Sequence, residues 1–165
     1  AILDFEAQMG LRMASRLNEV VDRLVKHLIH IFSGISATIA LTPIPISDIY
    51  ILLIIQSVLV SLIASLSGRD ISLETAKEFI LSMGGIAGAG YVFKLVAQQA
   101  SKFLNFVWPT SGSIISSGIA ATGTSAIGKA ASSYFIDDLP IGEAKKKFEE
   151  AKKENDETSV NYNNI

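Results

Sequence analysis

The stretch from Ile31 to Gly68 contains a single charged residue, Asp48. Pro43 and Pro45 interrupt this stretch, and proline ends a helix because it lacks an amide donor and restricts the residue before it. The pattern therefore predicts a hairpin of two apolar helices joined at the prolines. We expect Asp48 to cap the second helix, and the alternative is that it contacts a partner at the tip of the hairpin.

The second arm of this hairpin, Ile49 to Ser67, has no charged residue and is followed by Gly68. Its length suits a bilayer core of roughly 30 Å at about 1.5 Å per residue. A helix at the centre of a soluble bundle is also apolar on all sides, so protein is the alternative to lipid as its cover. We expect an all-α domain over residues 33–136, a multi-helix bundle around the hairpin, with membrane embedding as an open alternative.

Two amphipathic or charged helices are expected to flank this domain. Residues 1–32 predict an amphipathic helix that leads into it, because large apolar residues recur every three or four positions, and this stripe must dock on something. The stripe consists of Phe5, Met9, Met13, Leu17, Val20, Leu24, Leu28 and Ile31.

Ser72 is expected to cap a further helix. Residues 137–154, rich in Lys and Glu, predict a charged C-terminal helix, and residues 155–165 a disordered tail.

Composition narrows the function classes. Hydrophobic residues make up 49% of the 165 residues and charged residues 18%, whereas soluble domains carry about 25% charged residues. A net charge of −2 gives no general attraction for nucleic acid. The absence of cysteine excludes disulfides and thiolate metal sites. The N-terminus lacks a signal-peptide pattern, and because it does not start with Met we expect a segment of a longer protein.

Small residues mark the expected helix contacts. Ser57, Ser61 and Ser65 repeat every four residues and predict a groove for a neighbouring helix, with hydroxyls bonded to backbone carbonyls; a polar conduit lining is the alternative. Gln56 is the one strongly polar residue there, and we expect it to form an interhelical hydrogen bond because a buried amide needs a partner. The small-x3-small spacing of Gly84 and Gly88 favours close helix contact.

A phosphate-loop spacing, G-x4-G-K, occurs at Gly123, Gly128 and Lys129. That loop requires a preceding strand and a Ser or Thr after the lysine to hold Mg²⁺, but Ala130 stands there and the flanking residues are small rather than β-branched. We therefore interpret the segment as a helix with glycines at its packing face.

No catalytic, cofactor or metal site is expected. His27 and His30 are three residues apart on one helix face, but neither Cys nor further His accompanies them, so packing or interfacial histidines are favoured. No nucleophile–base set or pair of catalytic carboxylates can be assembled. The sequence thus indicates that the chain is not an enzyme.

The segment from Leu41 to Asp48, followed by Gln56 and Gly68, resembles the signature of a helical family, the domain of unknown function 697. That domain occurs in YcjF-like inner-membrane proteins and C-terminal to Era-related small GTPases. The similarity extends from about Ile35 to Phe135 and includes Gly128; the signature positions are Pro43, Pro45, Asp48, Gln56 and Gly68. The resemblance implies an all-α domain, often membrane-associated and often joined to a GTPase, and it supplies no catalytic residues.

Two main functions follow as hypotheses. The first is a non-catalytic, membrane-associated accessory domain, at an inner membrane or its cytoplasmic face if bacterial, with lipid or partner helices as partners and a small Era-like GTPase domain as companion. The second is a soluble, cytoplasmic helical module for interaction or dimerisation, including homo-oligomers. A nucleotide-binding protein is a weak third, and nucleic acid is not an expected partner.

Overall fold

The structure is a computed structural model that describes residues 2–41, 47–83 and 112–162. These residues are helical apart from short connections at 67–72 and 136–140, and they contain no β-strand. The helices are α1 (Ile2–Leu41), α2 (Ser47–Leu66), α4 (Gly112–Phe135) and α5 (Ile141–Tyr162), and residues 73–83 form a further helical stretch. The predicted all-α class is therefore confirmed.

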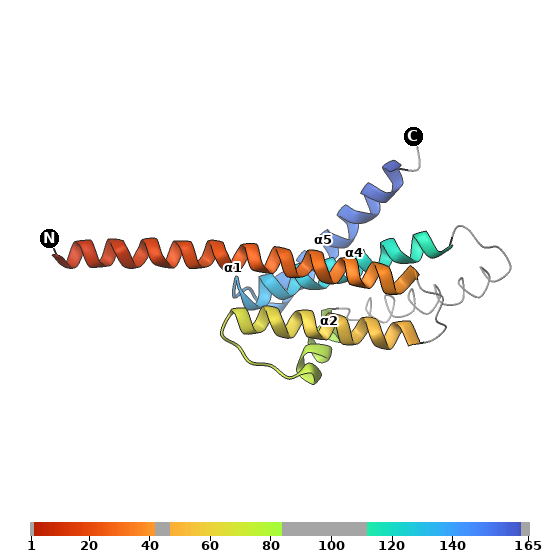
Figure 1. Cartoon of the computed structure of the whole chain (residues 1–165), viewed down its shortest axis with the longest axis horizontal. Helices are drawn as coiled ribbons and strands as arrows, with labels where there is room; N and C mark the ends of the chain where they lie inside the picture. The colour runs from red at the N-terminus through yellow and green to blue at the C-terminus, as the bar shows by residue number, and fades with distance from the viewer. Residues whose placement is uncertain (1, 42–46, 84–111, 163–165) are drawn as a thin grey trace.

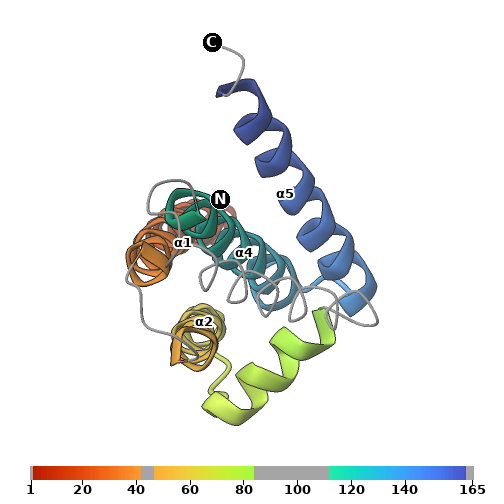
Figure 2. The same cartoon turned by 90° about the vertical axis from the view of Figure 1, so that its right-hand side faces the viewer.

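The helices form a bundle from which the N-terminal part of α1 projects (Figure 1). The C-terminal half of α1 runs beside α2 and α4, and both of these run antiparallel to it (Figure 1). Viewed along the bundle, α4 lies between the α1–α2 pair and α5 (Figure 2). In keeping with this central place, α4 contacts α1, α2 and α5.

The hydrophobic core joins all of these helices. Its main cluster of buried residues comes from the whole set of elements and consists of Val25, Leu59, Val60, Ile63, Ala64, Ala76, Phe79, Ile80, Met83, Ala126, Ile127, Ala130, Ala131, Phe135, Ala144, Phe148 and Ala151. A second, smaller cluster consists of Ala40, Leu52 and Ala120. The aromatic rings therefore concentrate in the main cluster, whereas the second cluster is one leucine packed between two alanines.

Local sequence signals explain the helix ends around Gly68. This glycine has a φ of 79°, a left-handed conformation that costs an L side chain about 1–2 kcal/mol. The Arg69 amide donates to the carbonyl of Ala64 at 3.0 Å, as in a glycine-terminated helix end. The helical stretch 73–83 begins after Ser72, whose Oγ accepts a hydrogen bond from the Thr75 amide at 3.1 Å. The expected Ser72 cap is confirmed.

Two predicted boundaries differ from the structure. α1 continues through residues 32 and 33 to Leu41, so the expected division at residue 32 falls inside one helix. α5 extends to Tyr162, so residues 155–162 are helical where a disordered tail was predicted. The physical reason is the same at both places, because neither sequence holds a proline that would stop the helix.

The proline-broken hairpin is described on both sides of its turn. α1 ends at Leu41 and α2 begins at Ser47, as the prolines predict. Pro43 and Pro45 lie outside the described residues, and so do Gly84 and Gly88. Asp48 lies in the first turn of α2, but its side chain is outside the described part, so its predicted capping role stays a prediction.

Candidate functional site

A chain of three buried polar side chains links α1, α2 and α4. The Gln56 amide nitrogen donates to Oγ1 of Thr124 at 3.1 Å, and the Thr124 hydroxyl donates to Oγ of Ser36 at 2.8 Å. Gln56 is 3% exposed, and the other two side chains are fully buried. The interhelical hydrogen bond expected of Gln56 is confirmed. Its partner Thr124 and the third member Ser36 were not predicted, because nothing in one sequence shows which small polar residues of distant helices meet.

Gly128 lies at a close contact of α4 with α1 and α2. A Cβ at this position would lie 2.5 Å from Cγ1 of Ile29 on α1 and 3.3 Å from Cδ2 of Leu59 on α2. Separations of that size overlap the van der Waals radii, so this glycine is what allows α4 to approach α1. The interpretation of Gly128 as a packing glycine is confirmed.

The three serines of α2 do not share one environment. Ser57 is buried and its hydroxyl donates to the Leu53 carbonyl at 2.7 Å, whereas Ser65 is exposed and donates to the Ser61 carbonyl at 3.0 Å. The Ser61 hydroxyl oxygen is buried and has no hydrogen-bond partner among the residues that the structure describes. The predicted bonds to backbone carbonyls therefore exist for two of them, but the row does not form one groove along the packed side of α2.

An open groove of about 320 Å³ lies instead between α1 and α4. Small and polar side chains from both helices dominate its lining, which consists of Ile29, His30, Ser33, Gly34, Ala37, Ala121, Thr122 and Ser125. The buried hydroxyl oxygen of Ser33 has no hydrogen-bond partner within residues 2–41, 47–83 and 112–162. The small-residue packing that the sequence assigned to α2 is thus found between α1 and α4.

Large apolar side chains are exposed along the whole length of α1. This set, the α1 stripe, consists of Phe5, Met9, Met13, Leu17, Val20, Leu24, Ile31 and Ile35. The exposed fraction reaches 64% at Met13 and Leu17. Of the residues predicted to form the stripe, only Leu28 packs against the main core. Contrary to the expectation that the stripe docks, it has no cover within the described part of the chain.

α2 presents a second exposed apolar set, Tyr50, Ile54 and Leu62, here called the α2 face. At about 100° per residue, Ile54 lies roughly 160° around α2 from Gln56, which contacts α4. Ile31 of the α1 stripe likewise lies roughly 160° around α1 from Ile29, which contacts α4 at Gly128. The α1 stripe and the α2 face therefore both point away from α4.

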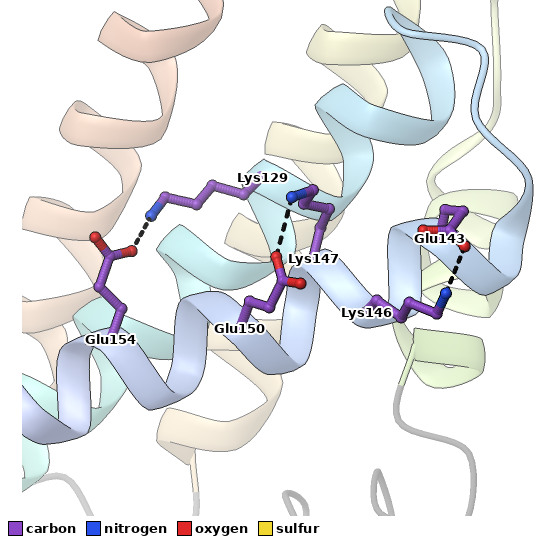
Figure 3. A network of polar contacts seen from close by, with 6 residues as sticks. All are labelled: Lys129, Glu143, Lys146, Lys147, Glu150 and Glu154. Carbon is purple, nitrogen blue, oxygen red and sulfur yellow. Dashed lines mark hydrogen bonds and ion pairs between the residues drawn. The ribbon is translucent and has the colours of Figure 1, made fainter.

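The side of the bundle beyond α4 is charged rather than apolar, because α5 lies there (Figure 2). Ion pairs one turn apart line α5, with Glu143–Lys146 at 2.6 Å and Glu150–Lys147 at 3.0 Å (Figure 3). The hydrogen bond and the charge of Glu143 raise the pKa of Lys146 above its ordinary value of 10.5. The described chain thus has an apolar side at α1 and α2 and a charged side at α5.

The segment with phosphate-loop spacing is helical, because Gly123, Gly128 and Lys129 all lie within α4. Backbone amides inside a helix bond to carbonyls of the same helix and do not face a phosphate. The Lys129 ammonium pairs with Glu154 of α5 at 3.0 Å (Figure 3). The interpretation of this segment as a helix with a packing glycine is confirmed.

The two histidines are exposed on α1, and Nδ1 of His27 lies 3.1 Å from the Arg23 carbonyl oxygen. Within the described residues, no group of three or more His, Asp or Glu side chains is placed to hold a metal ion.

Arg69 links the connection at 67–72 to the connection at 136–140 and was not singled out from the sequence. Its guanidinium pairs with Asp138 at 2.5 Å and lies 5.9 Å from the ring centroid of Tyr134 and 5.8 Å from that of Phe135. Asp138 has a positive φ of 53°, which is uncommon for a residue other than glycine. The pair lies at the surface, and its geometry fits a link between the ends of α2 and α4 rather than a binding site.

Among the described residues, one helix is long and apolar enough to cross a membrane, and it is α1 over Asp4–Leu41. α2, which the sequence favoured for this role, has 20 residues (Ser47–Leu66), and the part whose side chains the structure describes, Tyr50–Leu66, is apolar but shorter. Length and composition alone do not separate a membrane helix from the core helix of a soluble protein or from a signal sequence.

Comparison with models of known protein families identifies a family for this chain. The family model for a domain of unknown function, DUF697, matches residues 5–155, which include all of the described core. Neither the curated proteins nor the solved structures yield a match to the chain. Because the matched range covers most of its length, the chain belongs to the DUF697 family, as the signature around the two prolines and Gln56 predicted.

Proposed function

We propose that this chain is a non-catalytic helical accessory domain that associates with a membrane, at an inner membrane or its cytoplasmic face if the source is bacterial. The observation that carries the proposal is the exposed apolar side formed by the α1 stripe and the α2 face. Monomeric soluble proteins rarely expose contiguous apolar surface of this kind without a partner.

The interior opposite this side supports lipid as the partner. Where α1, α2 and α4 meet, the buried side chains include polar Ser36, Gln56 and Thr124, while large apolar side chains such as Ile31 and Ile54 point outward. Helices in membranes pack through small residues and satisfy their polar groups with one another, because lipid tails are as apolar as the side chains facing them.

Flotation of the purified chain with lipid vesicles tests this function. We expect the chain to float with vesicles of phosphatidylcholine and phosphatidylglycerol, and to need detergent to stay monodisperse in their absence. A detergent-free, monodisperse monomer that stays at the bottom of the gradient contradicts membrane association.

As a finer proposal, the domain is the companion of a small Era-like GTPase domain in the same or another chain. Its support is the family signature described above, together with the N-terminal part of α1, which projects from the bundle (Figure 1). Purification of the native full-length protein under mild detergent should yield a small GTPase domain in stoichiometric amount. A full-length protein that purifies without any GTPase contradicts this companion role.

A soluble interaction or dimerisation module is the second candidate. One observation favours it: α2 buries Leu59, Val60 and Ile63 completely in a core shared with aromatic residues of other helices, as soluble bundles do. In that case the apolar side is covered by a second copy or a partner protein. Sedimentation of the detergent-free chain as a dimer, without binding to vesicles, would establish this alternative.

A further inference from the structure

We infer that the domain lies flat on an anionic lipid surface, with α1 along the plane of the membrane and the α1 stripe and the α2 face turned into the lipid. This inference rests on the proposed membrane association and adds the contacting surface, the orientation and the lipid class. It differs from a bilayer crossing by α1, which length and composition alone would allow.

The length and continuity of α1 argue for the flat orientation. From Phe5 to Leu41 the helix measures about 54 Å at 1.5 Å per residue, whereas the hydrocarbon core is only about 30 Å thick. The α1 stripe is exposed from Phe5 to Ile35 without a break in the helix. A crossing would bury only part of this stripe, while a helix lying in the interface buries all of it.

The positions of arginine residues on α1 also favour the flat orientation. Arg12 and Arg16 each follow a stripe residue by three positions, namely Met9 and Met13. Arg23 follows Val20 in the same way, but its guanidinium is paired with Glu19 at 2.5 Å. Residues three apart are neighbours on a helix surface, so guanidinium groups border the stripe along one edge. Long basic side chains at such an edge reach anionic headgroups while their stems cover apolar surface.

The rest of the bundle is compatible with a flat membrane at this side. The α2 face points away from α4, as the α1 stripe does, and α1 and α2 contact each other, so the two exposed faces belong to adjacent helices. α5 with its ion pairs lies beyond α4 and remains in water (Figures 2 and 3). An upright insertion would instead leave the N-terminal part of the α1 stripe uncovered, since it projects from the bundle (Figure 1).

A matched pair of substitutions tests the contact. Leu17→Glu introduces a charge into the stripe, and Asn18→Glu introduces the same charge at the next position, outside it; both positions are exposed in the structure. We expect Leu17→Glu to lower partitioning into phosphatidylcholine–phosphatidylglycerol vesicles by about tenfold or more, from the loss of one buried leucine. Asn18→Glu should change it by less than about threefold. Equal losses for the two variants would overturn the stripe as the contact.

A second pair tests the lipid charge. Arg16→Gln should weaken binding to the anionic vesicles by about fivefold, the effect of one basic residue near the surface, and leave binding to phosphatidylcholine vesicles unchanged. Lys153→Gln on α5 is the control and should have no effect on either vesicle. A larger loss of vesicle binding for Lys153→Gln than for Arg16→Gln would mean that α5 rather than α1 contacts the lipid, and it would overturn the proposed orientation.

The orientation is read from depth measurements on the whole chain, which contains no native cysteine. Leu17→Cys, Ile54→Cys and Lys153→Cys are labelled with an environment-sensitive fluorophore and quenched by spin labels at shallow or deep positions of the acyl chains. We expect labels at 17 and 54 to be quenched equally, most strongly by the shallow spin label, and the label at 153 not at all.

The other outcomes separate the two proposals. Deep quenching at 54 with none at 17 means upright insertion and overturns the flat orientation, while membrane association stands. No quenching at any position, with no flotation, contradicts membrane association itself. Burial of the label at 17 in a vesicle-free dimer identifies a second copy as the cover and overturns the lipid contact.

Discussion

Thr124 on α4 accepts a hydrogen bond from the side-chain amide nitrogen of Gln56 on α2 at 3.1 Å, and both side chains are buried. The same hydroxyl donates its own proton to Ser36 of α1, so both capacities of one threonine are used between three helices. Because a slipped register would leave buried polar atoms without partners, this contact favours one alignment of the helices.

Thr124→Val removes this hydroxyl while keeping the shape of the side chain. The Gln56 amide then loses its acceptor in a buried site, so we expect the free energy of unfolding to fall by about 1–3 kcal/mol. Thr122→Val, in the open groove on the same helix, is the control and should change it by less than about 1 kcal/mol. Chemical denaturation of both variants measures the change in the free energy of unfolding. Equal changes for the two variants would show that the buried hydrogen bond of Thr124 does not stabilise the fold.

Gly128→Ala should destabilise the bundle, because the new Cβ would lie 2.5 Å from Cγ1 of Ile29. We expect a loss of about 1–3 kcal/mol, the usual cost of overpacking a tight contact. Gly118→Ala on the same helix meets nothing within 4 Å and should be neutral or stabilising, since alanine favours a helix over glycine by about 1 kcal/mol. Thermal denaturation measures both, and a stable Gly128→Ala variant contradicts the close approach.

The Gly128→Ala effect should be relieved by a second substitution. Ile29→Ala removes the atoms that the new Cβ would meet, so the double variant is expected to be more stable than the sum of the two single losses predicts. Strict additivity in this double-mutant cycle would mean that Ile29 is not the obstacle.

The chain is expected not to bind GTP or ATP through the segment with phosphate-loop spacing. Gly123 and Gly128 lie within α4, and the Lys129 ammonium pairs with Glu154 rather than being held for a phosphate. Titration with fluorescent GTP and ATP analogues should give no saturable signal for the parent chain. A measurable affinity that Lys129→Ala abolishes would show that this segment binds nucleotide after all.

Lys146 should titrate above its ordinary pKa of 10.5, because Glu143 accepts a hydrogen bond from its ammonium group and lies close as an opposite charge. A raised pKa in the folded state means that the folded protein holds this proton more tightly. The stabilisation is therefore complete below pH 10.5 and is lost as the pH rises through the raised pKa.

Glu143→Gln tests this titration. The substitution removes the charge of the partner, so the pKa of Lys146 should fall toward 10.5. Nuclear magnetic resonance of the isotopically methylated lysines measures it, and Lys153 on the same helix serves as the reference. An unchanged Lys146 titration in the variant would mean that Glu143 is not the cause.

The sequence alone determined the helical character of the chain and much of its local layout. Prolines locate the turn between α1 and α2, Gly68 ends α2, and Ser72 caps the next helix, because capping and helix-breaking depend on a few adjacent residues. The interhelical hydrogen bond of Gln56 could also be predicted from the sequence, because a buried side-chain amide needs a hydrogen-bond partner whichever helix packs against it.

Only the tertiary structure decided which residues meet and which face stays uncovered. Thr124 and Ser36 are distant from Gln56 in the chain, and Gly128 contacts Ile29 across two helices, so the relative rotation of the helices selects these partners. Periodicity located the apolar stripe of α1, but the bundle packs against the opposite face of that helix through Val25 and Ile29. The spacing of apolar residues shows that α1 has an apolar face that must be covered. The packing of α1 against α4 determines which face of α1 the bundle covers and which face remains for a partner.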